Sequence, residues 1–343
     1  MTEIMKPEEY RNQLLFGDSF EVLKRIPSNT VTAVVTDPPY GLSAQPDMKE
    51  VLKHWLAGDD YQHTSSGFMG KEWDSFVPGP KIWEEVMRVL KPGGHIFSFS
   101  GTRTYDLMVT AMRIAGAEVR DKIDYYCQQT AALAWVHGQG FPKSLDISKA
   151  IDKSVGAERN ADDTLTAPAT DEAKKWEGYG TALKPAHEPV AVFTKGESEF
   201  GDPDTPFLYE GKATTKERDY GCRNMFWKTE NEVTVRITRD EYKNLQKENE
   251  DNKDKEEFVP HKISHGNIWP TVKPIELMRY LVKMVKMPND NLILDPFMGS
   301  GSTVIGCILE GCDFIGIDMD PVAFDIATAR THYFRCLGNK GLK

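Results

Sequence analysis

A run of β-branched and small residues at 30–36, TVTAVVT, constrains the fold of this chain more than any other feature. Such a run is typical of a strand that is buried on both faces of a parallel sheet, because neither face has to be polar. We therefore expect a parallel sheet with both faces covered.

Segments that combine strand, turn and helix occur near both ends of the chain. In the segment 291–311, NLILDPFMGSGSTVIGCILEG, an apolar strand leads into a glycine-rich turn and then a helix. Alternating strands and helices predict an α/β fold with one doubly wound sheet, assembled from halves that are distant in the sequence. Further strands and helices of this pattern are expected in 12–29, 30–40, 82–101, 273–285 and 312–330.

The middle of the chain has a different composition. Residues 154–182 are rich in Ala, Thr, Asp and Gly, which predicts a loop. Residues 241–257 contain four lysines and seven acidic residues and are polar on all sides. This second segment is expected to form a solvated helix or an insertion.

Composition argues against membrane and metal functions. No apolar run reaches the roughly 18 residues of a membrane span, and the segment 1–10 lacks the apolar core of a signal peptide. The five cysteines form no CxxC pair, which is typical of reduced thiols. We expect a cytoplasmic protein with no membrane contact and no metal site.

The formal net charge of −10 argues mildly against a nucleic-acid partner. Phosphate binding depends, however, on where the cations lie rather than on their sum. Residues 207–239 hold seven Lys or Arg and five Asp or Glu, and Phe226 and Trp227 lie among them. This aromatic pair is expected either in a core or against nucleic acid. The candidate DNA-binding cations are Lys212, Lys216, Arg218, Arg223 and, outside this stretch, Lys143.

The turn Asp295–Thr303 lies at the carboxyl end of a predicted strand, where ligands bind in open α/β sheets. Gly299 and Gly301 allow backbone N–H groups to approach a ligand, and the following helix N-terminus favours an anionic group. A P-loop would end in Gly-Lys-Ser/Thr, and a dinucleotide fold would show GxGxxG, whereas this turn reads GSGSTV. A cofactor that carries a carboxylate remains.

Acidic residues end two further predicted strands. Asp318 is placed to accept hydrogen bonds from ribose hydroxyls, as in nucleotide-binding folds. Asp18 ends another strand and is placed to accept one from an adenine amino group. Each acid alone is also a suitable helix N-cap. Together with the glycine turn they describe a pocket for an adenosine joined to a carboxylate, which S-adenosylmethionine fits.

The tetrapeptide Asp37-Pro38-Pro39-Tyr40 follows the buried run directly. A base amino nitrogen is a poor nucleophile, because its lone pair is delocalised into the ring. The Asp37 carboxylate and the Pro38 carbonyl could each accept one N–H and so concentrate electron density on that nitrogen. Proline keeps the corner rigid, and Tyr40 offers a face on which a flipped base can stack.

With these motifs the chain resembles the amino-methylating DNA methyltransferases of the permuted β class. In that class the DPPY catalytic motif precedes the FxGxG cofactor motif, as Asp37–Tyr40 precedes Phe297–Gly301 here. The resemblance covers about 1–220 and 266–335, and part of it is to a branch common in phages and prophages. Matching segments are 17–42, 68–94, 140–152, 181–195 and 271–282.

The resemblance implies a Rossmann-like, doubly wound, mostly parallel seven-stranded methyltransferase sheet that is circularly permuted, with an inserted target-recognition region. We divide the chain into a catalytic half at 1–199, a target-recognition region at 200–265 and a cofactor-binding half at 266–343. The implied cofactor is S-adenosylmethionine, and the implied partner is double-stranded DNA in a bacterial or phage-infected cell. A homodimer is one expected form.

The family roles carry over to individual residues. Phe297 and the following turn would hold the methionine part of the cofactor, with Lys273 beside it and Asp318 on the ribose. The family usually has His-Pro-Thr where this chain has Trp269-Pro270-Thr271. The expected catalytic residues are Asp37, Pro38, Pro39 and Tyr40, and the expected cofactor-binding residues are Asp18, Lys273, Asp295, Phe297, Gly299, Ser300, Gly301, Ser302, Thr303 and Asp318.

We expect a site-specific DNA methyltransferase that acts on the N6 amino group of adenine, and alternatives stay open. An RNA or a protein amide is one alternative target, although nothing in the chain resembles the Asn-Pro-Pro-Tyr motif of amide methylators. Asp in the DPPY motif favours adenine, since cytosine-N4 enzymes of this resemblance more often carry Ser, but cytosine remains a candidate target. A DNA-binding protein with a decayed transferase site is a further alternative, against which the intact Asp37, Tyr40, Gly299, Gly301 and Asp318 argue.

Overall fold

The computed structural model of the protein describes residues 3–41, 46–63, 74–119, 133–136, 143–159, 167–183, 187–196, 211–253, 255, 259–287 and 290–338. The chain forms two compact units. One contains Met1–Trp135 together with Pro189–Lys343, and the other is Val136–Glu188.

One large sheet organises the first unit. Its strands follow the order β1-β13-β12-β2-β3-β8-β4, and an eighth strand, β5, pairs with β8. The pairs β1·β13, β13·β12, β12·β2 and β2·β3 are parallel, and β8 runs antiparallel to β3 and to β4. The strands are β1 (Gln13–Phe16), β2 (Val31–Thr36), β3 (Leu90–Phe99), β4 (Glu118–Val119), β5 (Leu133–Val136), β8 (His187–Thr194), β12 (Leu292–Asp295) and β13 (Asp313–Asp318). The expected mostly parallel sheet is confirmed, with one strand beyond the predicted seven.

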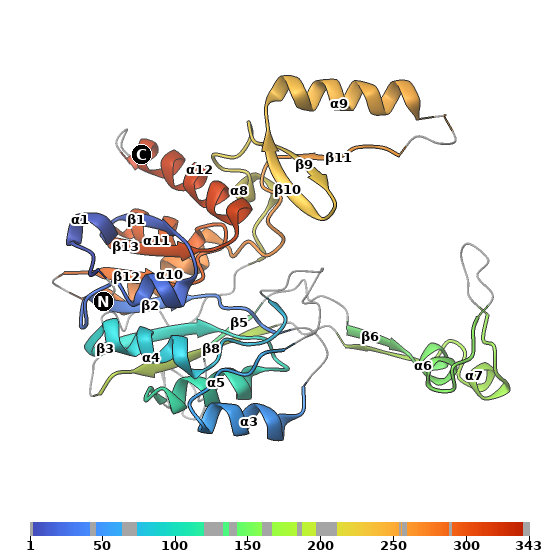
Figure 1. Cartoon of the computed structure of the whole chain (residues 1–343), viewed down its shortest axis with the longest axis horizontal. Helices are drawn as coiled ribbons and strands as arrows, with labels where there is room; N and C mark the ends of the chain where they lie inside the picture. The colour runs from blue at the N-terminus through green and yellow to red at the C-terminus, as the bar shows by residue number, and fades with distance from the viewer. Residues whose placement is uncertain are drawn as a thin grey trace. The chain divides into compact units, whose positions relative to one another are not determined.

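The two ends of the chain meet inside this sheet. Figure 1 shows β12 and β13 lying beside β1 and β2, and the strand order inserts β13 and β12 between them. In the register, Leu15 pairs with Ile317 and Ala33 pairs with Ile293. The predicted assembly from sequence-distant halves is therefore confirmed.

Both faces of the sheet are covered, as the β-branched run predicted. All six residues of β2 are buried, with Val34 in one apolar cluster and Ala33 and Val35 in another. The first cluster includes side chains of α2 (Ser19–Leu23), α3 (Met48–Leu56), α4 (Pro80–Val89) and α5 (Tyr105–Ile114). The second includes those of α10 (Ile275–Val285) and α11 (Ser302–Glu310). Two further helices contact the large sheet: α1 (Pro7–Tyr10) packs beside β1, and α12 (Pro321–Gly338) packs on β1 and β13.

A second sheet, with the order β10-β9-β11, lies within the predicted target-recognition region. Its strands are β9 (Phe226–Glu230), β10 (Val233–Ile237) and β11 (Lys262–His265), all paired antiparallel. Trp227 is buried with Cys222 and Met225 against Val322 and Ile326 of α12. Trp227 therefore belongs to a core, which was one of the two expected locations for the aromatic pair. The short helix α8 (Thr215–Arg218) precedes this sheet.

The helix α9 (Arg239–Asn252) packs on β9 and β11 and has no buried residue. Its polar composition explains why no side chain enters a core, and Thr238 caps its first turn by accepting from the Glu241 backbone N–H at 3.2 Å. The expectation of a solvated helix in 241–257 is confirmed for the residues up to Asn252.

The second compact unit contains β6 (Lys143–Asp146), α6 (Ile147–Ser154), α7 (Asp171–Lys175) and β7 (Gly180–Leu183), with β6 and β7 antiparallel. Although burial raises the pKa of Asp152, hydrogen bonds from Thr170, Ala169 and Arg159 lower it to about 2. The prediction of a loop over 154–182 was wrong at α7 and at the start of β7. Thr170, one of the polar residues that suggested a loop, instead caps α7.

Across the parts of the chain that the structure describes, no helix is both long enough and apolar enough to cross a membrane.

The contact between the segment before β9 and α12 depends on Gly221. Its φ is +78°, and a Cβ placed there would lie 2.5 Å from the Ala329 carbonyl oxygen. Gly116 has a φ of +89° and open space around its Cα, so it shares the backbone strain without the clash. We expect G116A to lower the free energy of unfolding by about 1 kcal/mol and G221A to lower it by at least about 2 kcal/mol. Urea unfolding of both variants tests this; equal losses would contradict the packing.

Candidate active site at the carboxyl ends of the strands

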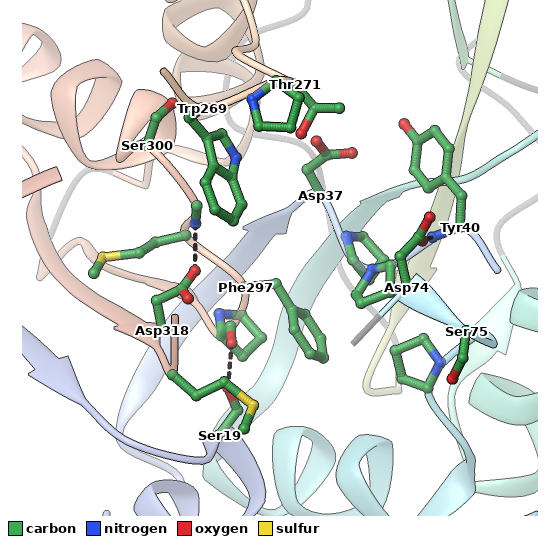
Figure 2. Close-up of a pocket in the computed structure, with 18 of the residues that line it drawn as sticks. Ser19, Asp37, Tyr40, Asp74, Ser75, Trp269, Thr271, Phe297, Ser300 and Asp318 are labelled. Atoms are coloured by element: carbon green, nitrogen blue, oxygen red, sulfur yellow. Dashed lines mark hydrogen bonds between the residues drawn. The ribbon is translucent and has the colours of Figure 1, made fainter. Parts of the chain in front are cut away.

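The four predicted strand ends converge on one cavity of about 890 Å³. In Figure 2, Asp37 and Tyr40 lie on the right and Asp318 and Ser19 on the left, with the rings of Trp269 and Phe297 between them. Parallel strands carry their carboxyl ends to the same edge of a sheet, which explains how residues nearly 300 positions apart line one space. The predicted site residues on its wall are Asp18, Asp37, Pro38, Pro39, Tyr40, Lys273, Asp295, Phe297, Gly299, Ser300, Ser302, Thr303 and Asp318.

The glycine turn joins β12 to α11 and is held from the neighbouring strand. The Gly299 N–H donates to the Asp318 carboxylate at 2.8 Å, and the Met298 N–H donates to the Ile317 carbonyl at 3.0 Å. Gly299 has a φ of +50°, and a Cβ there would lie 3.1 Å from Trp269 Nε1. A glycine is therefore required at this position by conformation and by space.

Gly301 differs from the other predicted cofactor residues, because it is not among the described residues that line the cavity. It has a φ of +78°, and a Cβ there would lie 3.1 Å from Ala327 Cβ of α12. Gly301 therefore lets α11 begin close to α12, and its contact with the cofactor remains a prediction.

A buried cation lies under the glycine turn, which the sequence analysis missed. Arg330 of α12 is fully buried and donates to the Ser300 carbonyl at 2.7 Å, to Ser300 Oγ at 3.0 Å and to Ser302 Oγ at 3.2 Å. Burial lowers its pKa to about 10, so the guanidinium stays charged at neutral pH. A single arginine in a helical sequence carries no signal of such a role.

Two carboxyl groups at this edge are less acidic than usual. Burial raises the pKa of Asp318 to about 7, although backbone donors of Asp320 and Gly299 lower it. Burial likewise raises the pKa of Asp295 to about 6, against hydrogen bonds from Thr303 and Thr36. Such values are frequent at functional sites, where charged groups are withdrawn from water.

Asp18 caps a helix, as one of its two expected roles required, and its contact with an adenine amino group remains a prediction. Its carboxylate accepts from the Glu21 backbone N–H at 3.0 Å and so caps α2, and Asp18 also lines the cavity. Beside it, the Ser19 hydroxyl donates to the Pro296 carbonyl (Figure 2), which ties the start of α2 to the glycine turn.

The loop after β2 is fixed through the backbone of Tyr40. The Asp74 carboxylate accepts from the N–H groups of Tyr40 at 2.8 Å and Gly41 at 3.1 Å. The Thr104 hydroxyl donates to the Tyr40 carbonyl at 2.6 Å. Neither Asp74 nor Thr104 was identified from the sequence. The segment 68–94, which contains Asp74, matched the family without pointing to one residue, and Thr104 lies outside the matched segments.

Lys273 reaches the catalytic motif. Its ammonium forms an ion pair with the Asp37 carboxylate and lies 3.2 Å from the Tyr40 hydroxyl. The residue is 8% exposed. The expected place beside the methionine end of a cofactor remains a prediction, because in this structure the ammonium contacts Asp37.

Trp269, which stands where the family usually has histidine, is buried and lines the cavity over Gly299. Arg218 donates to the carbonyls of Trp269 and, at 3.4 Å, of Pro270. The Arg218 guanidinium thus holds the main chain of the cavity wall, and its predicted phosphate contact remains a prediction.

The other predicted DNA-binding cations lie away from the cavity lining. Three of them are exposed: Lys212 precedes α8, Lys216 lies in it, and Arg223 follows it. Lys143 lies in β6 of the other compact unit, and its side chain lies outside the described part of the chain. Their DNA contacts remain predictions.

Comparison with known proteins supports the class of protein that this fold and cavity suggest. A family model described as DNA methylase, of the N6/N4 type, matches residues 31–329. The chain belongs to this family of N6/N4 DNA methylases.

Two relatives are Type II methyltransferases. M.HindIII of Haemophilus influenzae is 25% identical, over 92% of this chain and 93% of the relative. M.BglII of Bacillus subtilis is 25% identical, over 94% of this chain and 69% of the relative. The predicted resemblance to the amino-methylating DNA methyltransferases is thus confirmed at the level of the family.

Among solved structures, the PvuII DNA methyltransferase, described as cytosine-N4-specific, matches with a TM-score of 0.50 and 14% identity. The match covers 96% of this chain and 94% of that protein. At this identity the likeness supports the methyltransferase fold and says nothing about the target base.

The raised pKa of Asp318 predicts a pH-dependent effect on stability. The unfolded chain releases this proton near pH 4, whereas the folded chain holds it until about pH 7, so the folded state loses stability relative to the unfolded state across this range. We expect the free energy of unfolding of D318N, relative to wild type, to rise by at least about 1 kcal/mol between pH 4.5 and pH 8. Urea unfolding at both pH values measures this change. The exposed Asp106→Asn serves as control. If the free energy of unfolding of D318N relative to wild type changes with pH no more than that of the control, the burial of the Asp318 charge is contradicted.

Proposed function

We propose that this DNA methylase transfers a methyl group from S-adenosylmethionine to the N6 amino group of adenine in double-stranded DNA. The observation that carries the proposal is the single cavity in which the fixed Asp37–Tyr40 loop faces the glycine turn and Asp318. The loop supplies acceptors for an amino group, and the opposite wall supplies the features of a nucleotide site.

The cavity fits the cofactor. The amino end of α11 and the buried Arg330 beneath it create positive potential where a carboxylate would bind. Asp318 offers a carboxylate for ribose hydroxyls, and Asp18 lines the same wall. When bound, S-adenosylmethionine supplies an electrophilic methyl group on a sulfonium. The rings of Phe297 and Trp269 line the cavity between these groups and Asp37.

The residues of the opposite wall act on the target. Hydrogen bonds from a base amino group to Asp37 and to the Pro38 carbonyl raise the electron density on nitrogen before transfer. As the N–C bond forms and the S–C bond breaks, the nitrogen becomes positively charged, so these acceptors stabilise the transition state more than the ground state. The methylated amino group then loses one N–H proton to solvent. Tyr40 presents a face for stacking of the flipped base. Because Asp74 and Thr104 hold the Tyr40 backbone from both sides, the acceptors keep their geometry without reorganising.

The choice of adenine rests on Asp37. Cytosine-N4 enzymes of this class more often carry Ser at that position, and cytosine N4 is the second candidate target. A decayed site is disfavoured because the acceptor loop, the glycine turn and Asp318 all retain an ordered hydrogen-bond arrangement.

Methyl transfer from labelled cofactor to duplex DNA, RNA and protein, measured in parallel, tests the reaction. Base-resolved mapping of DNA from cells that express the protein then identifies both the base and the recognition sequence. Label in RNA or protein but not in DNA would overturn the proposal, and methyl groups on cytosine N4 would replace its finer part.

The Asp37 carboxylate is the group whose loss should stop the chemistry. We expect D37A to lower the transfer rate at least about a hundredfold while S-adenosylhomocysteine still binds. Single-turnover kinetics and calorimetry separate the two effects, and the exposed Asp106→Ala is the matched control. A folded D37A that works within about tenfold of wild type would refute the assignment.

We further propose that 200–265 reads the DNA sequence through a polar strip on the second sheet, consisting of Thr229, Thr234 and Lys262. These residues are cross-strand neighbours on one face, and the two hydroxyls lie 2.9 Å apart. All three line the cavity, whereas the opposite face of the sheet carries α9. The exposed Lys212, Lys216 and Arg223 are candidates for additional phosphate contacts.

Two substitutions in the strip should differ in effect. We expect Thr234→Val to relax the methylated sequence, since it removes a hydrogen-bonding group from a base reader, and to leave the salt dependence of DNA binding intact. Lys262→Ala should flatten the plot of log affinity against log salt by about one unit, as for one lost phosphate contact. The exposed α9 variant Lys243→Ala is the control. Unchanged sequence and unchanged slope in both variants would place the DNA elsewhere.

A further inference from the structure

The Lys273 ammonium occupies the place that the mechanism gives to the target amino group. It contacts the Asp37 carboxylate and lies 4.9 Å from the ring centre of Phe99, 5.3 Å from that of Tyr40 and 6.0 Å from that of Trp135. Aromatic faces and a carboxylate together stabilise a cation strongly when water is excluded. Lys273 is 8% exposed, so this arrangement is largely withdrawn from solvent.

An ammonium in this position opposes methyl transfer in two ways. It takes up acceptor capacity on Asp37 that the target N–H needs, and it lies beside the Tyr40 face on which the base would stack. Its charge also withdraws electron density from the carboxylate that should raise the nucleophilicity of the amino nitrogen. The lysine-bound form of Asp37 is therefore not the form that accepts a base.

The backbone of Lys273 is fixed close to the other end of the cavity. Its carbonyl accepts from Ser302 Oγ at 2.8 Å, and Ser302 is the first residue of α11. The amino end of α11 favours an anion, as does Arg330 beneath it. The main chain of Lys273 thus lies beside the anion-favouring helix end, while its side chain extends to Asp37.

We propose that Lys273 is a counter-ion switch that couples the two halves of the cavity. Without cofactor the ammonium closes the amino-acceptor site on Asp37; a carboxylate bound at the amino end of α11 draws it away and opens that site. This inference rests on the proposed methyl transfer and adds an order of events, in which the base amino group binds Asp37 after the cofactor has bound. Lys273 is a positioning residue in this scheme.

The switch implies a reciprocal coupling. If cofactor binding strengthens capture of the target amino group by some factor, the amino group strengthens cofactor binding by the same factor, and couplings of about 5- to 150-fold are typical. The carboxylate should be essential to this coupling, because the adenosine part alone offers the ammonium no new partner.

The test compares duplexes that carry the mapped sequence with either adenine or purine at the target position, since purine lacks the 6-amino group. The ratio of their affinities reports capture of that group. In wild type, saturating S-adenosylhomocysteine should raise this ratio at least about fivefold. Saturating 5′-methylthioadenosine, which has no carboxylate, should leave it unchanged. An unaltered ratio with S-adenosylhomocysteine, or an equal rise with both compounds, would overturn the proposal.

Substitution of the lysine provides a second arm. Lys273→Met keeps the length of the side chain and removes its charge, so the ratio should be high without any cofactor and should not rise further with it. The exposed Lys283→Met on α10 should behave like wild type. A folded Lys273→Met that still needs S-adenosylhomocysteine would also refute the switch, and the wild-type comparison decides the question if that variant does not fold.

Failure of the switch is distinguishable from failure of the proposed function. Wild-type protein that methylates no DNA refutes the proposed function before the binding test begins. If mapping finds cytosine as the target, the same comparison uses cytosine and pyrimidin-2-one, and the prediction for Lys273 is unchanged.

Discussion

Parallel pairing of β12 with β2 is the constraint on which the rest of the structure depends. Ala33 and Val34 pair with Ile293 and Leu294, although about 260 residues separate them. At the carboxyl ends, the Thr36 hydroxyl donates to the buried Asp295 carboxylate at 2.7 Å, so the residues just before the catalytic loop and the glycine turn are joined by a side-chain hydrogen bond as well. Without this pairing, the acceptor loop and the nucleotide wall would lie on separate parts of the chain. Bringing β2 and β12 together closes a long stretch of chain, which costs conformational entropy. The burial of all six residues of β2 offsets this cost.

The same edge of the sheet concentrates buried charge. Asp295 and Asp318 are withdrawn from water, which raises the pKa of both, and Arg330 is charged and fully buried under the glycine turn. Groups of this kind oppose folding unless they are paired or hydrogen-bonded, and here the backbone N–H groups of the turn and the hydroxyls around it supply the partners. The arrangement is typical of a ligand-binding site, because a bound cofactor with a carboxylate would compensate charges that the protein's own groups compensate only in part.

The sequence predicted what depends on local pattern. The β-branched run, the glycine turn and the acids at strand ends identified the parallel sheet and the strand-end residues of the cavity wall, because each is encoded in a few neighbouring residues. What it missed depends on contacts between distant segments. Asp74 and Thr104 act through the backbone of Tyr40. Arg330 reaches the glycine turn from α12, which is separated from the turn by α11 and β13. The close approach of Gly301 to Ala327 likewise depends on how the helices pack. In 154–182 the residues at the start of α7 suggested a loop, because Thr and Asp are frequent both in loops and at helix N-caps.

The segment that leads to the proposed recognition sheet is hydrogen-bonded to the segment that carries Lys273. Arg218 holds the carbonyls of Trp269 and Pro270, Asp219 accepts from the Asn267 N–H at 2.8 Å, and Glu217 accepts from the Ile275 N–H at 2.5 Å. Residues 217–219 therefore form hydrogen bonds to the main chain on both sides of Lys273, within the segment 267–275. They also lie directly before the sheet whose polar strip faces the cavity. The Asp37–Tyr40 loop is held instead by Asp74 and Thr104, which contact the backbone of Tyr40. The carboxylate and the lysine of the proposed switch are thus positioned by different parts of the chain, so Lys273 can change its partner without a change in the hydrogen bonds that fix the loop.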